Sequence, residues 1–216
     1  MRPDLSWPDF QPLHSGGQLQ EILASLDESG LYFKPGFIDP TITNAWQQYA
    51  EKQSDEHRFH KASIGLDDSN RKDPSIRADS ILWVQEFSGV TAPIGHWLKQ
   101  LSDELKNHFR VSLETIESHF SIYSEGAHYA KHIDNGIGQN SRFFTFIFYL
   151  NPAWKAGDGG ELVIYDPKQS QRSIHTIAPR SGTFVIFRSD LFYHEVLASR
   201  VPRYTFTGWL RRYEAV

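Results

Sequence analysis

The sequence contains no cysteine, which excludes disulfide bonds and thiolate metal ligands. It also lacks any apolar run long enough to cross a membrane, and the N-terminal MRPDLSWPDF has no apolar stretch of the signal-peptide kind. Basic residues do not outnumber acidic ones: the net charge is −4 and the sequence pI is about 6.2. No general positive field therefore favours nucleic acid. We expect a cytoplasmic, monomeric protein that binds neither nucleic acid nor membrane.

The composition that remains is typical of one folded, strand-rich domain over residues 1–216, with 39% hydrophobic and 14% aromatic residues. Apolar residues at helical spacing predict helices over residues 17–28, 40–52 and 91–109. After Val111, short segments rich in aromatic and β-branched residues alternate with turn residues. This pattern predicts an α+β fold in which helices brace a sandwich, barrel or jelly roll, and the spacing does not choose among these three.

Three residues of the strand-rich part can form a metal site. His132 and Asp134 are two apart in YAKHIDNG, and His194 lies in LFYHEVL. Residues i and i+2 of a strand project from the same face, so His132 and Asp134 can point into one cavity. Two imidazoles and one carboxylate form the facial triad of non-haem Fe(II) oxygenases, which leaves coordination positions open.

Arg203 follows His194 after a turn marked by Pro202. If the two segments form a hairpin, His194 faces Thr207, and Arg203 lies four residues from Thr207 on the same strand face, about 13 Å away. A five-carbon diacid together with an arginine side chain can cover such a gap, with one end of the diacid on a metal and the other on the guanidinium. Arginine suits this task because its fork binds a carboxylate through two parallel hydrogen bonds.

Together, His132-x-Asp134, His194, and Arg203 with Thr205 resemble the 2-oxoglutarate- and Fe(II)-dependent oxygenases. The surrounding segments are similar to prolyl 4-hydroxylases of the oxygen-sensing type and their bacterial relatives, over residues from about 58 to 212. These segments are IRADSILWV, YAKHIDN, RFFTFIFYLNPAW, GDGGELVIY, FRSDLFYHEV and PRYTFTGWLR.

The resemblance implies a double-stranded β-helix (a cupin-like jelly roll) over about residues 111–212, braced by the N-terminal helices. It implies Fe(II), 2-oxoglutarate and O2, with ascorbate as reductant. The implied activity is hydroxylation of a prolyl residue in a protein, with a translation elongation factor as one candidate, coupled to conversion of 2-oxoglutarate to succinate. Residues 65–78 would form a mobile loop that closes over this substrate.

The resemblance also assigns roles to individual residues. The metal ligands would be His132, Asp134 and His194. The 2-oxoglutarate site would contain Arg203, Tyr149, Tyr123, Thr205 and Thr207, although Tyr123 needs a gap to align with the family pattern. The substrate site would contain Arg77, Asp79, Tyr129, Arg142 and Trp209. The remaining strand histidines His119, His128 and His175 are interpreted as structural or surface residues.

Two other functions fit the same residues. The first is the same oxygenase chemistry on a small molecule or on another side chain, which a compact, rigid 65–78 loop and a narrow apolar mouth would favour. The second is a non-catalytic jelly roll that binds a metal and senses a ligand. The complete set of ligand positions together with Arg203 counts against the second.

Overall fold

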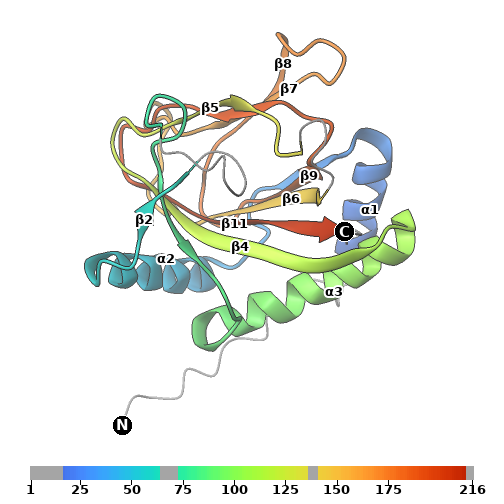
Figure 1. Ribbon diagram of the computed structural model, residues 1–216, viewed down its shortest axis with the longest axis horizontal. Coiled ribbons are helices and arrows are strands. Elements are labelled where there is room, and N and C mark those ends of the chain that lie inside the picture. The colour runs from blue at the N-terminus through green and yellow to red at the C-terminus, as the bar shows by residue number, and fades with distance from the viewer. Residues whose placement is uncertain (1–16, 64–72, 136–140, 213–216) are drawn as a thin grey trace.

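The computed structural model describes residues 17–63, 73–135 and 141–212 (Figure 1). Two antiparallel sheets face each other, which confirms the predicted jelly-roll class. The major sheet has the order β1-β9-β6-β11-β4-β3-β2. Its strands are β1 (Leu31–Lys34), β2 (His60–Lys61), β3 (Ser80–Trp83), β4 (Leu113–Tyr123), β6 (Arg142–Tyr149), β9 (Phe184–Arg188) and β11 (Arg203–Arg212). The minor sheet has the order β5-β10-β7-β8, from β5 (Tyr129–His132), β10 (His194–Val196), β7 (Leu162–Tyr165) and β8 (Ser173–Ile177).

The three predicted helices are confirmed and cover one side of the major sheet (Figure 1). The Asp39 side chain accepts a hydrogen bond of 2.7 Å from the Thr41 amide and so caps the start of the second helix, whose first residue is Pro40. The third helix ends at Phe109, after which Arg110 takes a left-handed conformation. The helical elements are α1 (Gly17–Ser29), α2 (Pro40–Asp55), η2 (Gly89–Thr91) and α3 (Ala92–Phe109).

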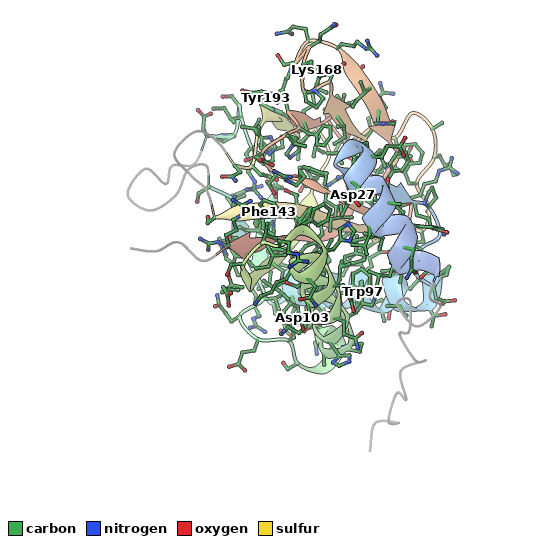
Figure 2. All side chains as sticks on the ribbon, turned by 90° about the vertical axis from the view of Figure 1, so that its right-hand side faces the viewer. Asp27, Trp97, Asp103, Phe143, Lys168 and Tyr193 are labelled. Atoms are coloured by element: carbon green, nitrogen blue, oxygen red, sulfur yellow. The ribbon has the colours of Figure 1, made fainter. Side chains whose placement is uncertain are left out.

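Alternation along the strands of the major sheet produces two separate cores. Phe206 of β11 packs toward the helices, together with Phe148 of β6 and Trp46 of α2. The ring centroid of Trp46 lies 6.0 Å from that of Phe206 and 6.0 Å from that of Phe148. Thr205 and Thr207, the neighbours of Phe206, project from the opposite face, toward the minor sheet. The helix side can therefore be filled with aromatic rings while the other side stays available for a polar cavity. Trp97 extends this helix-side core from α3 (Figure 2).

The predicted pairing of His194 with Thr207 is wrong. β11 pairs with β4 and β6, whereas His194 pairs with His132 of β5 and with Ile164 of β7. The chain between β10 and β11 crosses from one sheet to the other because its backbone is bonded to distant loops. The Ser199 amide donates to the Ala127 carbonyl at 3.0 Å, and the Arg200 amide donates to that of Asp158. His194 and Arg203 consequently lie on facing sheets.

The predicted substrate loop is only partly described, since residues 65–72 lie outside the described ranges. Its C-terminal end forms a turn in which the Ile76 and Arg77 amides donate to the Asp73 carbonyl at 3.0 and 2.9 Å. Arg77 then forms an isolated bridge with Tyr129, which attaches this end of the loop to β5.

At the other end of the minor sheet the β7–β8 hairpin, with Lys168 near its tip, projects from the body of the molecule (Figure 2). No helix in the described ranges is both long and apolar enough to cross a membrane.

Gly208 of β11 provides a test of how tightly the central strands pack. A Cβ atom on this residue would lie 2.1 Å from the carbonyl oxygen of Glu117 and 2.7 Å from Cζ of Phe146. We expect Gly208→Ala to lower the free energy of unfolding by about 1–3 kcal/mol, measured by urea denaturation, because backbone must move to admit the methyl group. The control is Gly17→Ala, where the added atom meets nothing within 4 Å. Equal unfolding free energies for the two variants would contradict this packing.

Candidate metal and cosubstrate site

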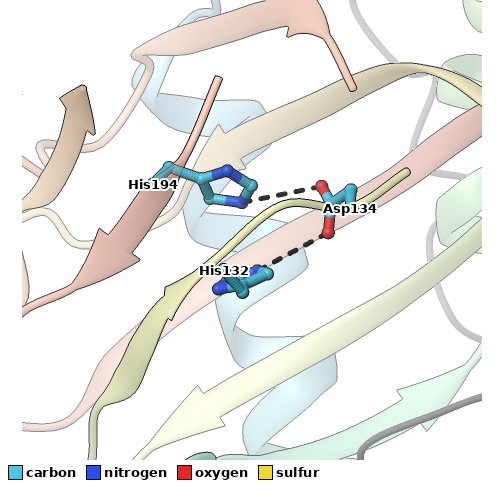
Figure 3. A group of neighbouring side chains, drawn as sticks. All are labelled: His132, Asp134 and His194. Carbon is cyan, nitrogen blue, oxygen red and sulfur yellow. Dashed lines mark ion pairs between the residues drawn. The ribbon is translucent and has the colours of Figure 1, made fainter. Parts of the chain in front are cut away.

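His132, Asp134 and His194 converge between the two sheets, with their ligand atoms within 4.8 Å of one another (Figure 3). The Asp134 carboxylate lies between the two imidazoles, 3.5 Å from Nε2 of His132 and 3.6 Å from Nε2 of His194. His132 ends β5 and His194 begins β10, and these two residues are paired across the minor sheet. Strand pairing therefore brings together ligands that are far apart in the sequence.

Hydrogen bonds orient both imidazoles. Nδ1 of His132 lies 2.8 Å from the Ala130 carbonyl, and Nδ1 of His194 lies 3.1 Å from the Phe192 carbonyl. A carbonyl can only accept, so each Nδ1 carries the proton and each Nε2 presents its lone pair to the cavity. This is the arrangement expected of metal-binding histidines, in which the second ring nitrogen is held by an outer partner.

The protonation states also suit a divalent cation. Burial lowers the pKa of His194 to about 4, so its imidazole is neutral at neutral pH. Burial by itself would raise the pKa of Asp134, but the adjacent His194 and His132 hold it well below its ordinary value. Two imidazoles and one carboxylate form a donor set that fits Fe(II) and leaves coordination positions for other ligands.

Arg203 lies at the other end of the same cavity and is 2% exposed. Its Nε donates to the Gly160 carbonyl at 2.8 Å, and its guanidinium carbon lies 4.7 Å from the Tyr123 ring centroid and 5.1 Å from that of Tyr149. Within the described ranges Arg203 has no carboxylate partner. The Tyr149 hydroxyl is buried next to this guanidinium and has no other hydrogen-bond partner in the described part of the chain. A buried guanidinium with a hydroxyl at its side fits a bound carboxylate, the group that 2-oxoglutarate would present here.

The remaining predicted 2-oxoglutarate residues differ in what they can offer. Thr205 lies next to Arg203 on the cavity face of β11, opposite Ser121 of β4. Thr207 also lines the cavity, but its hydroxyl donates to the Phe146 carbonyl at 2.8 Å. The Thr207 proton is thus used within the sheet rather than toward the metal.

Aromatic and charged residues surround the metal end. The Tyr129 ring stacks on the His132 imidazole at 3.6 Å, and the Arg77 guanidinium lies 4.7 Å from the Tyr129 ring centroid. Asp79 is fully buried and does not line the cavity; it holds Arg77 by hydrogen bonds of 2.7 and 3.0 Å. Of this predicted substrate-binding pair, only Arg77 reaches the cavity.

Trp209 and Arg142 lie together on one side of the His132–Asp134–His194 group. The Arg142 guanidinium stacks on the Trp209 ring at 3.5 Å and forms an ion pair of 2.8 Å with Glu117. Trp209 lines the cavity, whereas Arg142 lies behind it. Arg203 and Trp209 are six residues apart on one face of β11, so they lie toward opposite ends of the cavity. This placement agrees with a substrate that binds beside Trp209, away from Arg203.

Comparisons with known proteins agree with this geometry. Residues 118–211 match the sequence model of the 2OG-Fe(II) oxygenase superfamily. A prolyl-4-hydroxylase of Pseudomonas putida has a similar structure, with a TM-score of 0.80 and 25% identity over 91% of this chain and 100% of that one. The match to the sequence model includes His132, Asp134, His194 and Arg203, so the part of the chain that holds the site is similar to the 2OG-Fe(II) oxygenase superfamily.

Two curated relatives of this chain are similar over part of their length. A PKHD-type hydroxylase of Synechocystis, itself uncharacterized, is 29% identical over 63% of this chain and 50% of its own. The hypoxia-inducible factor prolyl hydroxylase of Caenorhabditis elegans is 32% identical over 62% of this chain and 20% of its own. The chain thus spans half or less of these two relatives.

Several cavity residues were not predicted from the sequence. They come from β4, β6, β7 and β10 and are His119, Ser121, Thr145, Ile147, Leu162 and Val196. The interpretation of His119 as a structural residue is incomplete, because this imidazole lines the cavity. The alternation of residues in SHFSIY could have predicted this position. His119, Ser121 and Tyr123 share one strand face, and the family resemblance already assigns Tyr123 to the site. His175 is exposed, and His128 is half-buried with its Nε2 3.0 Å from the Ser75 carbonyl.

Thr145 supports the metal site from behind. Its hydroxyl donates to Oδ2 of Asp134 at 2.7 Å and lies 2.8 Å from the Ser189 hydroxyl. We expect Thr145→Val to weaken Mn(II) binding about 10- to 100-fold, because the carboxylate loses the bond that orients it. The measurement is a titration of Mn(II) into the metal-free protein. Thr183→Val is the matched control, since the buried Thr183 hydroxyl has no hydrogen-bond partner in the described part of the chain. An equal loss of Mn(II) affinity in both variants would contradict this role of Thr145.

Proposed function

We propose that this oxygenase uses Fe(II) and 2-oxoglutarate to hydroxylate a prolyl residue in a protein substrate. The observation that carries the proposal is the presence, in one cavity, of the His132–Asp134–His194 group and of the Arg203 guanidinium, which has no carboxylate partner among the described residues. The first fits a metal with open positions, and the second fits the far carboxylate of a diacid. The prolyl residue is favoured by the names of the similar proteins, which include a prolyl-4-hydroxylase and a hypoxia-inducible factor prolyl hydroxylase.

Each residue would contribute to the reaction in a way that follows from its contacts. His132, Asp134 and His194 would hold Fe(II), whose redox chemistry couples decarboxylation of 2-oxoglutarate to hydroxylation. Arg203 and the Tyr149 hydroxyl would bind the far carboxylate and so fix the direction of the cosubstrate. The apolar side chains of Leu162 and Val196 exclude water from the space between the sheets. Ascorbate would restore a metal oxidised without substrate.

The substrate would enter beside Trp209, on the side away from Arg203. Stacked rings and guanidinium groups line this side, and they suit an extended peptide with a proline ring, which packs on aromatic faces. Arg77, Tyr129 and Trp209 are its proposed contacts in the cavity, with Arg142 and Asp79 supporting them from behind. A translation elongation factor stays the predicted substrate, and a cytoplasmic location and an oxygen-sensing role also stay predictions.

The experiment is incubation of the protein with Fe(II), 2-oxoglutarate and cell lysate, followed by mass spectrometry for residues that have gained one oxygen atom. We expect a modified prolyl residue that is absent when the Asp134→Ala protein is used. Oxygen gained only by another side chain, or only by small molecules, would replace the prolyl assignment with the related chemistry. Absence of both oxygen insertion and succinate would instead favour a non-catalytic ligand sensor.

A further inference from the structure

His119 is a buried imidazole whose polar atoms have no protein partner. It lies on the cavity face of β4, opposite Thr207 of β11 and Trp83 of β3. The residue is 1% exposed, and neither Nδ1 nor Nε2 forms a hydrogen bond in the described part of the chain. Every form of imidazole carries at least one N–H donor, and a buried donor without a partner is costly. A group that enters the cavity would supply the missing partner.

The neighbours of His119 leave only its edge available for this partner. The Trp83 and Trp209 ring centroids lie 4.8 and 5.5 Å from the centroid of the imidazole. Two indoles hold the imidazole in place from the β3 and β11 sides, so the ring nitrogens are the atoms that remain for a ligand. Trp209 adds a second buried donor, because its Nε1 also has no partner among the residues that the structure describes. Two aromatic N–H groups on one side of the cavity suit a ligand with carbonyl acceptors.

The position of His119 separates it from the cosubstrate end. Arg203 is paired with Tyr123, whereas His119 lies four residues further along β4, about 13 Å at roughly 3.4 Å per residue. From His119 the strand continues to Glu117, which binds Arg142 and Arg211. Beyond it a surface groove of about 440 Å³ begins, lined by Trp83, Gln85, Thr115, Glu117 and Arg211 among others. On β4, His119 therefore lies between Tyr123, which is paired with Arg203, and the residues that line this groove.

The hydrogen-bonding groups beside a prolyl residue indicate which partner His119 could have. A peptide bond to proline has a carbonyl oxygen but no N–H, so the polar groups beside a prolyl ring are acceptors. Burial, with Arg77 and Arg142, holds the pKa of His119 well below its ordinary value, so at neutral pH the ring has one donor and one acceptor. One such donor matches one carbonyl.

We propose that His119 is a substrate-binding residue that donates a hydrogen bond to a backbone carbonyl beside the target residue and so places that residue at the metal. This inference rests on the proposed function, in which the target residue is proline. It makes His119 a determinant of substrate binding rather than of cosubstrate or metal binding.

The test compares three substitutions of His119 on a synthetic peptide that carries the residue modified in the lysate experiment. His119→Phe keeps the aromatic contacts with the two indoles but removes both nitrogens. His119→Asn and His119→Gln place an amide donor near the positions of Nδ1 and Nε2 respectively. We expect His119→Phe to lower kcat/KM for the peptide about 10- to 100-fold and one of the two amides to recover most of this loss. The affinity for 2-oxoglutarate, titrated into the Mn(II) form, should change less than about twofold.

Packing alone predicts the opposite order, because phenylalanine would then be tolerated better than either amide. That order, an unchanged kcat/KM in His119→Phe, or an equal loss of 2-oxoglutarate affinity would each overturn the assignment of His119. If the wild-type protein modifies a residue other than proline, the proposed function fails, and the same comparison on that peptide still decides the role of His119.

Discussion

Replacing Asp134 by alanine is expected to abolish succinate formation while the protein remains folded. The carboxylate lies between the two imidazoles and supplies the only negative charge of the triad. Without it, only two imidazoles remain, and these bind a divalent ion much more weakly. His132→Ala and His194→Ala should have the same effect, because each removes one of the three protein ligands. The measurements are succinate production and the affinity for Mn(II).

His128→Ala is a matched control for the histidine variants. His128 precedes β5 by one residue, and its Nε2 lies 3.0 Å from the Ser75 carbonyl rather than near the triad. Its substitution should leave both metal binding and succinate production close to those of the wild type. Near-normal turnover in any one of the three triad variants would refute the assignment of the metal ligands.

Arg203 should determine the affinity for 2-oxoglutarate. Arg203→Ala would leave a carboxylate buried without its charged partner, at a cost of roughly 3–5 kcal/mol, or a loss of affinity of more than about a hundredfold. Arg203→Lys should fall between the wild type and alanine, because lysine conserves the charge but not the fork. The measurement is a titration of 2-oxoglutarate into the Mn(II) form of each variant.

Two controls distinguish this effect from general damage. Metal affinity in the absence of 2-oxoglutarate should hardly change in either Arg203 variant, since Arg203 is not a ligand. Arg200→Ala removes an exposed arginine from the segment that leads to the same strand and should bind 2-oxoglutarate normally. Unaltered 2-oxoglutarate affinity in Arg203→Ala would remove the cosubstrate from this end of the cavity.

The sequence predicted the elements of the fold well because they depend on local patterns. Apolar periodicity located α1, α2 and α3 to within a few residues, and Asp39 with Pro40 marked the start of α2. Strand pairing depends instead on residues far apart. The segment from Leu197 to Pro202 reads as a hairpin turn, but it crosses between the sheets because Ser199 and Arg200 bond to the loops near Ala127 and Asp158.

The residues of the site also fall into those that local sequence patterns reveal and those that only long-range contacts reveal. His132 and Asp134 could be paired from their spacing alone, and Arg203 from its motif. Thr145 and His119 could not, because their importance arises from β6 and β4 meeting the minor sheet across the cavity. Asp79 illustrates a further gap: the sequence places it beside Arg77, but only burial reveals that the carboxylate holds Arg77 and cannot reach a ligand.

The two halves of the site lie on strands of very different length and position. Arg203 is on β11, a strand of 10 residues flanked on both sides by β4 and β6, so its amides should exchange with solvent only when the whole domain unfolds. The metal ligands are held by β5 and β10, of 4 and 3 residues, whose amides can exchange by local opening of the minor sheet. A metal that bridges these short strands would raise the free energy of that opening by its own binding energy. Amide exchange of β5 and β10 should therefore slow on metal binding while that of β11 changes little.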